Sequence, residues 1–231
     1  MRIKLQVPTA IVLVILVPLA AANGGGMTRP SMPNMPRLDT PQQKAQAAYN
    51  DGVRGVKKAD KAQAAADAAS DAGRKDKAAR EAHDDYAAAN AKFKAALELD
   101  ATLPEAWNYL GYTNRKLGNY DEALTAYGKA LELKPGYADA LEYRGEAYLG
   151  LRRIADAQQA YLDLYAGSRN LAQKLLDAMK GWLAAQRAAG ADAAAHGRVS
   201  LEDLDKWIQE RAQIAAQTAA LTRAGTAASW R

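Results

Sequence analysis

The sequence predicts an all-α protein, a right-handed solenoid of stacked helical hairpins with capping helices at its C-terminal end. Three observations support this. The apolar residues are mostly alanine, with one Phe and four Trp among 231 residues, and the abundant Lys, Glu, Gln and Leu also favour helices. Similar segments recur at an offset of about 34 residues, as expected for repeated helix pairs. Turn signals containing Gly, Asn or Pro separate the helical segments. A core with so few large residues must be thin, with closely approaching helices.

Residues 1–22 have the layout of a secretory signal peptide. Arg2 and Lys4 precede an apolar run at residues 11–19, and Ala20 and Ala22 fit the small-residue pattern of a cleavage site. The run is shorter than the ~20 residues that a membrane span requires, and Pro18 interrupts it. We therefore expect cleavage after Ala22 and a periplasmic or secreted protein, with an uncleaved anchor as the alternative.

Composition and charge exclude several kinds of protein. The chain has no cysteine, which excludes disulfides, thiol catalysis and a lipid-modified cysteine at the cleavage point. Removing Arg2 and Lys4 from 31 basic residues leaves 29 against 26 acidic ones, a net charge of +3. Acidic residues lie among the basic clusters, which indicates a solvated mixed-charge surface and no nucleic-acid partner.

The first helical segment follows a linker, residues 23–39, whose Gly, Pro and Met content predicts flexibility. Thr40, Pro41 and Gln43 form the signature of a capping box. Residues 86–99 have the pattern of a second helix, and two partners for it are open. Either residues 70–83 pair with it, or residues 40–103 form one lengthened hairpin, which we favour because the earlier segment supplies more apolar contacts. Those contacts would come from Ala48, Tyr49, Gly52, Val53 and Val56.

Residues 104–137 carry the most regular pattern of the chain. Its positions, in order, are Trp107, Leu110, Gly111, Ala123, Tyr127, Ala130 and Pro135. This pattern resembles the tetratricopeptide repeat, a pair of antiparallel helices, with Asn114 as a departure where an aromatic residue is usual. The small residues would allow close helix crossings, and the aromatic rings of Trp107, Tyr120 and Tyr127 would fill the wider spaces between helices.

Residues 138–171 form a second, degenerate copy of the repeat. The matching positions are Gly145, Tyr148, Ala157, Tyr161 and Leu164. Leu141 replaces the Trp, Arg144 the Leu and Arg169 the Pro.

Residues 172–231 are expected to form two capping helices. The first has an apolar face made by Leu171, Leu175, Leu176, Met179, Trp182 and Leu183, and it stops at Gly190. Ser200 and Asp203 resemble a capping box that opens the second. A repeat stack needs terminal elements whose outer face is polar. The alternative is a helix that folds back into the binding groove.

The resemblance implies a concave groove lined by the first helix of each pair. The groove residues carried over to this chain are Glu105, Asn108, Tyr109, Tyr112, Arg115 and Lys116 from one repeat, with Asp139, Glu142, Tyr143 and Glu146 from the next. Tyrosine mixed with charge suits the binding of extended or helical peptides.

The expected partner is a protein or peptide that carries Lys or Arg near apolar side chains. The family's clamp of Lys, Arg and Asn, which grips a C-terminal carboxylate, is not reproduced here. Four carboxylates would repel such a ligand: Glu105, Asp139, Glu142 and Glu146.

We expect neither catalysis nor a metal or cofactor. His83 and His196 are the two histidines, and nearby residues do not supply the further ligands that a metal needs. The sequence also lacks a nucleophile elbow and a phosphate-binding loop. Asp203, Asp205 and Glu210 interrupt the basic character of the last helix, which argues against membrane contact.

The sequence therefore predicts a non-enzymatic interaction module or scaffold of the bacterial cell envelope, serving assembly of outer-membrane or secretion machinery or wall synthesis. The alternative is a structural protein that self-associates through a long hairpin at residues 42–99. Its alanine-rich faces permit close packing, but they lack the sustained Leu or Ile heptads of a coiled coil. The partner and the oligomeric state are left open.

Overall fold

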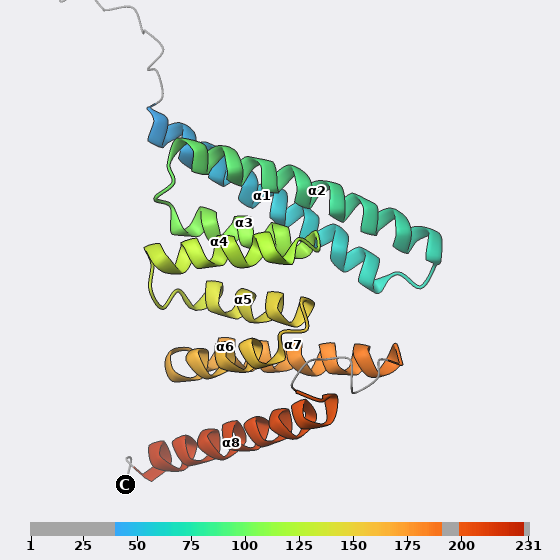
Figure 1. The fold of residues 1–231 in the computed structure, drawn as a ribbon, viewed down its shortest axis with the longest axis vertical. Coiled ribbons are helices and arrows are strands. Elements are labelled where there is room, and N and C mark those ends of the chain that lie inside the picture. The colour runs from blue at the N-terminus through green and yellow to red at the C-terminus, as the bar shows by residue number, and fades with distance from the viewer. Residues whose placement is uncertain (1–39, 191–198, 229–231) are drawn as a thin grey trace, which may run out of the picture. The chain divides into compact units, whose positions relative to one another are not determined.

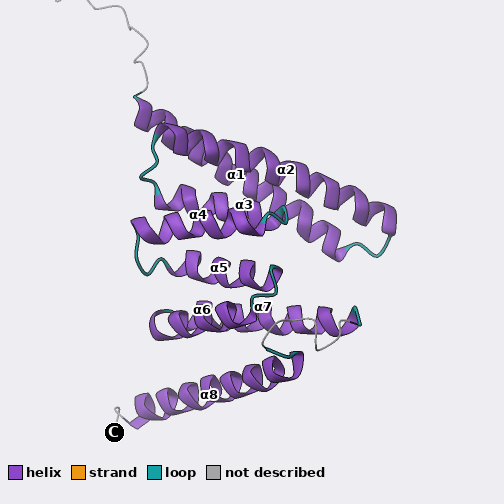
Figure 2. Cartoon of the chain, in the orientation of Figure 1, coloured by secondary structure: helices purple, strands orange, loops and turns teal. Residues whose placement is uncertain are grey.

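The computed structural model describes residues 40–190 and 199–228, with side chains up to residue 223. Within these ranges the chain forms eight α-helices and no strand (Figures 1 and 2). The predicted signal peptide, the linker at 23–39 and His196 lie outside the described residues. The fold is an all-α helical-hairpin solenoid, as the sequence predicts.

The first hairpin consists of α1 (Pro41–Ala68) and α2 (Ala72–Leu99). The capping box predicted at Thr40 is present: the Thr40 hydroxyl accepts from the backbone N–H of Gln43, and the Gln43 side chain accepts from that of Thr40. The Asp71 side chain accepts from the N–H of Arg74 at 2.8 Å. Because Asp71 caps the second helix, the break between the two helices falls at residues 69–71.

Small residues at seven-residue spacing bring these two long helices together. On α1 they are Ala45, Gly52, Ala59 and Ala66, and on α2 they are Ala82, Ala89 and Ala96; all are buried. Such a seam lets helix axes approach closely. A Cβ atom on Gly52 would lie 2.6 Å from the Phe93 ring. The partner of α2 is therefore the earlier segment, and each helix of the hairpin is 28 residues long.

The second hairpin is α3 (Pro104–Lys116) and α4 (Tyr120–Leu133). Gly118, with a φ of +81°, supplies the left-handed residue that the turn between them needs. Gly111 lies against Tyr127, since a Cβ there would be 2.5 Å from that ring. Trp107 is half-buried between two apolar clusters, and its indole N–H donates to the carbonyl of Ala101 at 2.8 Å.

A buried polar link explains the departure at Asn114. The Asn90 side chain on α2 donates to Thr113 Oγ1 at 2.9 Å and to Asn114 Oδ1 at 3.1 Å. An aromatic residue at 114 would leave the buried Asn90 amide with one partner fewer. The polar contact thus joins the first hairpin to the second.

The third hairpin is α5 (Ala138–Gly150) and α6 (Ile154–Gly167). Gly145 does not face the aromatic residue of its own hairpin, Tyr161. A Cβ on Gly145 would meet Leu175 at 2.5 Å, so α5 packs closely on α7 (Arg169–Ala188). Tyr161 instead contacts Trp207 on α8 (Leu201–Ala228), with ring centroids 5.2 Å apart. The imperfect repeat pattern therefore reflects packing against the C-terminal helices.

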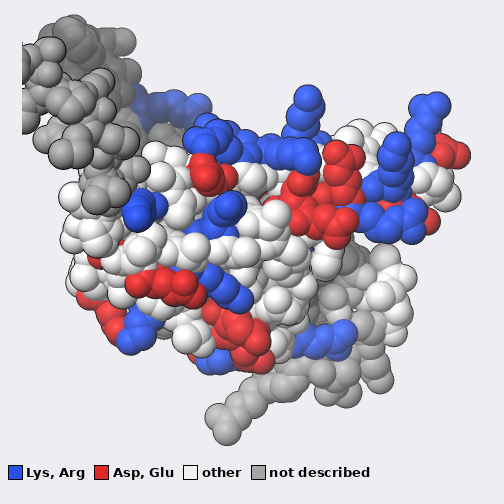
Figure 3. Space-filling model, turned by 90° about the horizontal axis from the view of Figure 1, so that it is seen from above, with Lys and Arg blue, Asp and Glu red and all other residues white. Residues whose placement is uncertain are grey.

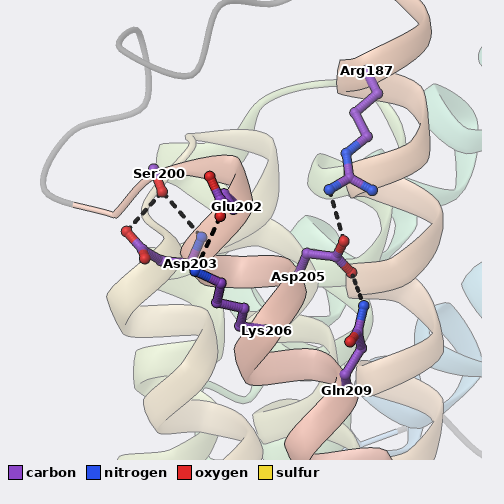
Figure 4. Close-up of polar contacts among 7 residues, drawn as sticks. All are labelled: Arg187, Ser200, Glu202, Asp203, Asp205, Lys206 and Gln209. Atoms are coloured by element: carbon purple, nitrogen blue, oxygen red, sulfur yellow. Dashed lines mark hydrogen bonds and ion pairs between the residues drawn. The ribbon is translucent and has the colours of Figure 1, made fainter.

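The two C-terminal helices both bury apolar side chains in one cluster, and those of α7 are the ones that the sequence predicts. On α7 these are Leu171, Leu175, Leu176, Met179 and Leu183, with Trp182 partly buried; on α8 they are Leu201, Leu204 and Ile208. Ser200 Oγ accepts from the backbone N–H of Asp203 at 3.0 Å and donates to the Asp203 carboxylate at 2.7 Å, so one half of the capping box is present (Figure 4). Arg187 joins α7 to Asp205 of α8 at 2.7 Å.

The outer face of α8 is only partly polar. Farther along this helix Ile214 is 40% exposed and Leu221 is 74% exposed. The buried apolar contacts of α8 come from its N-terminal half, whereas in its C-terminal half the hydroxyl of Thr218 lies 3.3 Å from that of Tyr165 on α6.

The first helices of successive hairpins contact one another in the order α1, α3, α5 and α7. This row of helices forms one surface, which we call the first-helix face. Elsewhere on the first hairpin, basic and acidic side chains are interspersed (Figure 3), and Lys58 is paired with Asp85 at 2.8 Å. None of the described helices is long and apolar enough to cross a bilayer.

Candidate partner-binding face

The ten predicted site residues all lie on α3 and α5, but their exposure differs widely. Lys116 and Asp139 are exposed. The half-buried members are Glu105, Tyr109, Tyr112, Arg115, Tyr143 and Glu146. Asn108 and Glu142 are only 3% and 4% exposed. These last two therefore lie between layers of the stack and present almost no surface to a partner.

Four tyrosines from three layers form a continuous row on the first-helix face. We call Tyr49, Tyr109, Tyr112 and Tyr143 the tyrosine row. Its neighbouring ring centroids lie 5.9 Å apart from Tyr49 to Tyr109, 6.4 Å from Tyr109 to Tyr112 and 5.1 Å from Tyr112 to Tyr143. All four residues are partly exposed. The sequence pattern identified three of these positions, whereas Tyr49 joins them only because α1 stacks beside α3.

Asp60 on α1 holds one ring of the tyrosine row in place by a hydrogen bond. This residue was not among the predicted site residues. Its Oδ1 accepts hydrogen bonds from Tyr86 at 2.5 Å and from Tyr112 at 2.7 Å. Burial, followed by the bond to Asp60, raises the pKa of both phenols well above the usual value. Both hydroxyls therefore remain donors. Asp60 and Tyr112 are 52 residues apart in sequence, so no local spacing could have paired them.

Arg115 and Glu146 form an ion pair between α3 and α5, with side chains 12% and 25% exposed. The Arg115 guanidinium also lies 5.2 Å from the Tyr112 ring centre and 5.4 Å from that of Tyr143. Burial, the largest influence, acts to lower the pKa of Arg115, but the Glu146 carboxylate and the phenols of Tyr127 and Tyr112 together outweigh burial, so the pKa is raised. Arg115 therefore stays positively charged, and its ion pair with Glu146 holds it beside the rings of the tyrosine row.

Glu142 lies one helical turn before Glu146. Burial, and then the neighbouring Glu146 carboxylate, raise the pKa of Glu142 to about 8. At neutral pH this carboxyl is therefore mostly protonated.

The face carries less free negative charge than the four predicted carboxylates suggest. Glu146 is paired with Arg115, and Glu105 with Lys134 at 3.1 Å. Glu142 is mostly neutral for the reason given above, which leaves Asp139 as the exposed acid of the four. Repulsion of an anionic ligand is therefore weaker than four ionised carboxylates would produce.

Two small cavities open beside the tyrosine row. One, of about 190 Å³, is lined by Gln46, Tyr49, Leu103, Glu105 and Ala106. The other, of about 180 Å³, is lined by Arg115, Tyr120, Glu146, Leu149, Gly150, Ala178 and Trp182. Trp182 was predicted as a packing residue of the capping helix. Its place at a cavity depends on α7 stacking beside α5, which the repeat pattern does not encode.

No group of three or more His, Asp or Glu residues suited to hold a metal occurs within the described ranges. His83 is exposed and lies beside Asp84, with Nδ1 and Oδ1 3.6 Å apart. What the first-helix face does offer is amphipathic rings, paired charges and two shallow cavities, which are features of a binding surface.

A comparison with known protein families matches the part of this face that α3 contributes. The matched segment begins at the first residue of α3 and includes all of α4. Residues 104–137 match the family model for the tetratricopeptide repeat, and this match supports a general role in protein–protein interaction.

Proposed function

We propose that this protein is a non-enzymatic interaction module that binds a peptide segment or helix of a partner protein on the first-helix face. The observation that carries the proposal is the tyrosine row, which runs across three layers and stays partly exposed. Tyrosine rings give large contact area at low entropic cost. The match of residues 104–137 to an interaction repeat supports the same assignment.

The proposed setting is the bacterial cell envelope, as a periplasmic or secreted scaffold. This part of the proposal depends on residues 1–22, whose pattern is that of a cleavable signal peptide. Fusing this segment to a reporter enzyme that is active only after export checks the proposed location. A reporter that stays inactive in the cytoplasm would contradict it.

A matched pair of double variants tests the binding face. Tyr109→Ser with Tyr143→Ser removes two rings of the tyrosine row, whereas Leu133→Ser with Leu162→Ser changes side chains that are 43% and 42% exposed on α4 and α6. Each protein is used to capture partners from its own cell envelope. We expect the tyrosine variant to recover at least about tenfold less of the main partner, because interface rings of this kind each contribute more than about 1 kcal/mol.

Two controls complete this test. The helicity and melting temperature of both variants must show that each is folded at the temperature of capture. If the leucine variant loses the partner and the tyrosine variant keeps it, the binding face is on the second helices and the proposal is wrong.

Self-association through the long first hairpin is the alternative function, and the packing argues against it. The small residues at seven-residue spacing already pair α1 with α2 and are buried there, so this seam is not available to a second copy of the protein. Light scattering of the mature protein distinguishes the two functions, because a monomer at micromolar concentration is incompatible with a self-associating role.

A further inference from the structure

A cavity of about 240 Å³ opens between α6, α7 and α8, at the C-terminal end of the described stack. None of the residues that line it belongs to the tyrosine row or to the ten predicted site residues. Since a cavity of about 150 Å³ can hold a benzene molecule, this one has room for one aromatic ring and a short polar group. It is therefore a separate candidate site, of the size that one small ligand needs.

The walls of this cavity are mainly apolar. Tyr161 and Tyr165 of α6 contribute two stacked rings, with centroids 5.7 Å apart, and α8 contributes the methyl group of Ala215. The hydroxyl of Thr218 donates to the carbonyl of Ile214 at 2.8 Å, so at the 3.3 Å contact with Tyr165 the tyrosine is the donor. This bond joins α6 to α8, which holds the two walls in place before a ligand binds.

A cation and an amide lie at the open side of the cavity. Among the described residues that line it, Arg169 at the start of α7 is the one that carries a charge, and its guanidinium lies 5.4 Å from the centre of the Tyr165 ring. The Asn170 Oδ1 atom accepts from the Ser168 hydroxyl at 2.7 Å, which directs the amide N–H groups of Asn170 toward a ligand as donors. Arg169 and Asn170 are both exposed, so an acid group can reach them.

The acidic residues of α6 and α7 do not balance this cation. The first turn of α7 contains no acidic residue. Asp177, one turn after the cavity residue Gln173, accepts from Gln173 and from Lys180, each at 3.0 Å. On α6, Asp163 lies two residues from each of the cavity tyrosines, and residues two apart do not share a helix face.

The surroundings on α8 are neutral or positive. Residues 212–222 contain no charged side chain. Glu210 and Arg211 precede them and pair with each other at 3.4 Å. Burial raises the pKa of the Tyr161 phenol, and the charged group that acts on this phenol is Arg211, which opposes the rise. The charges around the cavity therefore favour an anion.

We propose that this cavity binds a small aromatic carboxylic acid, with its ring against Tyr161 and Tyr165 and its carboxylate at Arg169 and Asn170. A guanidinium and an amide form charge-assisted hydrogen bonds with a carboxylate. Offset or edge-to-face contacts with the tyrosines stabilise the ring of the ligand. The site lies apart from the tyrosine row, so the proposal goes beyond the proposed function and does not depend on it.

Titration of small probes into the full chain tests the site. The acid probe is 3-phenylpropanoate, and 3-phenylpropanamide is its matched neutral control. The indole N–H signal of Trp207 is followed by NMR, because its ring centroid lies 5.2 Å from that of Tyr161. We expect the acid to bind at least about tenfold more tightly than the amide, since hydrogen bonds to an ionised acceptor are about twice as strong as neutral ones. Arg169→Gln should remove most of this difference, whereas Arg80→Gln, at an exposed position of α2, should leave it unchanged.

A second pair of variants tests the cavity itself. Ala219 lines the cavity and is exposed, so Ala219→Leu should fill the space and abolish binding of 3-phenylpropanoate. Ala216→Leu is the matched control, because Ala216 is exposed on the same helix and does not line the cavity; binding should be unchanged. Helicity and melting temperature show whether each variant is folded. If a variant is not folded, the comparison of acid and amide on the wild-type protein decides the matter.

Four outcomes would overturn the proposal. They are equal binding of the acid and the amide, preferential binding of 3-phenylpropylamine, tighter binding of N-acetyl-glycyl-phenylalanine, which would assign the cavity to the end of a peptide, and no response of Trp207 to any probe. None of these affects the partner capture that tests the tyrosine row. Conversely, loss of capture would leave a positive probe result standing, so the two failures are distinguishable.

Discussion

Four glycines on the first helices face a bulky side chain of a neighbouring helix. Gly52 faces Phe93, Gly111 faces Tyr127, Gly145 faces Leu175, and Gly150 faces Tyr120. In each case a Cβ atom would lie between 2.3 and 2.6 Å from the opposing side chain. These glycines thus allow neighbouring helices to pack as closely as a core rich in alanine requires.

Substitution of Gly111 tests this role. Gly111→Ala should destabilise the protein by about 1–3 kcal/mol, because the tightly packed Tyr127 ring has to move. Gly128→Ala is the matched control, since Gly128 is also within a helix and has nothing within 4 Å of its Cβ position. The control should stabilise α4 by about 0.5–1 kcal/mol. Urea denaturation measures both, and equal effects of the two substitutions would refute the packing role.

The buried carboxyl of Glu142 should give the stability of the protein a characteristic pH dependence. Its folded-state pKa is raised from 4.5 to about 8, so the folded protein binds more protons than the unfolded one between these values. The free energy of unfolding should therefore fall as pH rises through this window, by up to about 5 kcal/mol from this residue.

Glu142→Gln isolates this contribution because glutamine retains a hydrogen-bond donor and cannot ionise. Denaturation at pH 5.5 and pH 9 should show a smaller loss of stability for the variant than for the wild type. The variant should also be the more stable of the two at pH 9. Parallel pH profiles would mean that Glu142 is ionised in the folded protein at neutral pH.

Helices α1 and α2 pair through alanine and glycine at every seventh position. Ala59 is fully buried in this seam, whereas Ala64 is exposed on the same helix. Ala59→Leu should cost about 1–3 kcal/mol because the larger side chain forces the helices apart. Ala64→Leu should change stability by less than about 0.5 kcal/mol. Thermal unfolding by circular dichroism measures both, and a neutral effect at Ala59 would contradict the close pairing.

Local sequence signals predicted most of the helices. The capping residue Thr40, the turn glycine Gly118 and the apolar spacing of Leu171 to Leu183 act within a few residues, so they can be read directly from the chain.

Contacts between hairpins could not be predicted in the same way. Gly145 meets Leu175 of α7 instead of a residue of its own repeat, and Asp60 accepts from a tyrosine 52 residues away. The candidate site was therefore only partly predicted. Tyr109, Tyr112 and Tyr143 lie on the expected face, whereas Asn108 and Glu142, at 3% and 4% exposure, are enclosed between layers.

Taken together, the described layers place rings from α1, α3 and α5 on one continuous surface, with paired charges beneath them. No single hairpin contains this surface, because it arises only when first helices stack on first helices. The central claim is that a partner protein lies along this row.

Site-specific photocrosslinking tests that claim most directly. A photoreactive residue replaces Tyr109 on the first-helix face or, as the control, Lys129 on the exposed side of α4, where the lysine side chain is 50% exposed. Irradiation in the intact cell envelope should give one dominant crosslinked partner from position 109 and little or none from position 129. Equal crosslinking from both positions, or a dominant partner from position 129 alone, would contradict the claim.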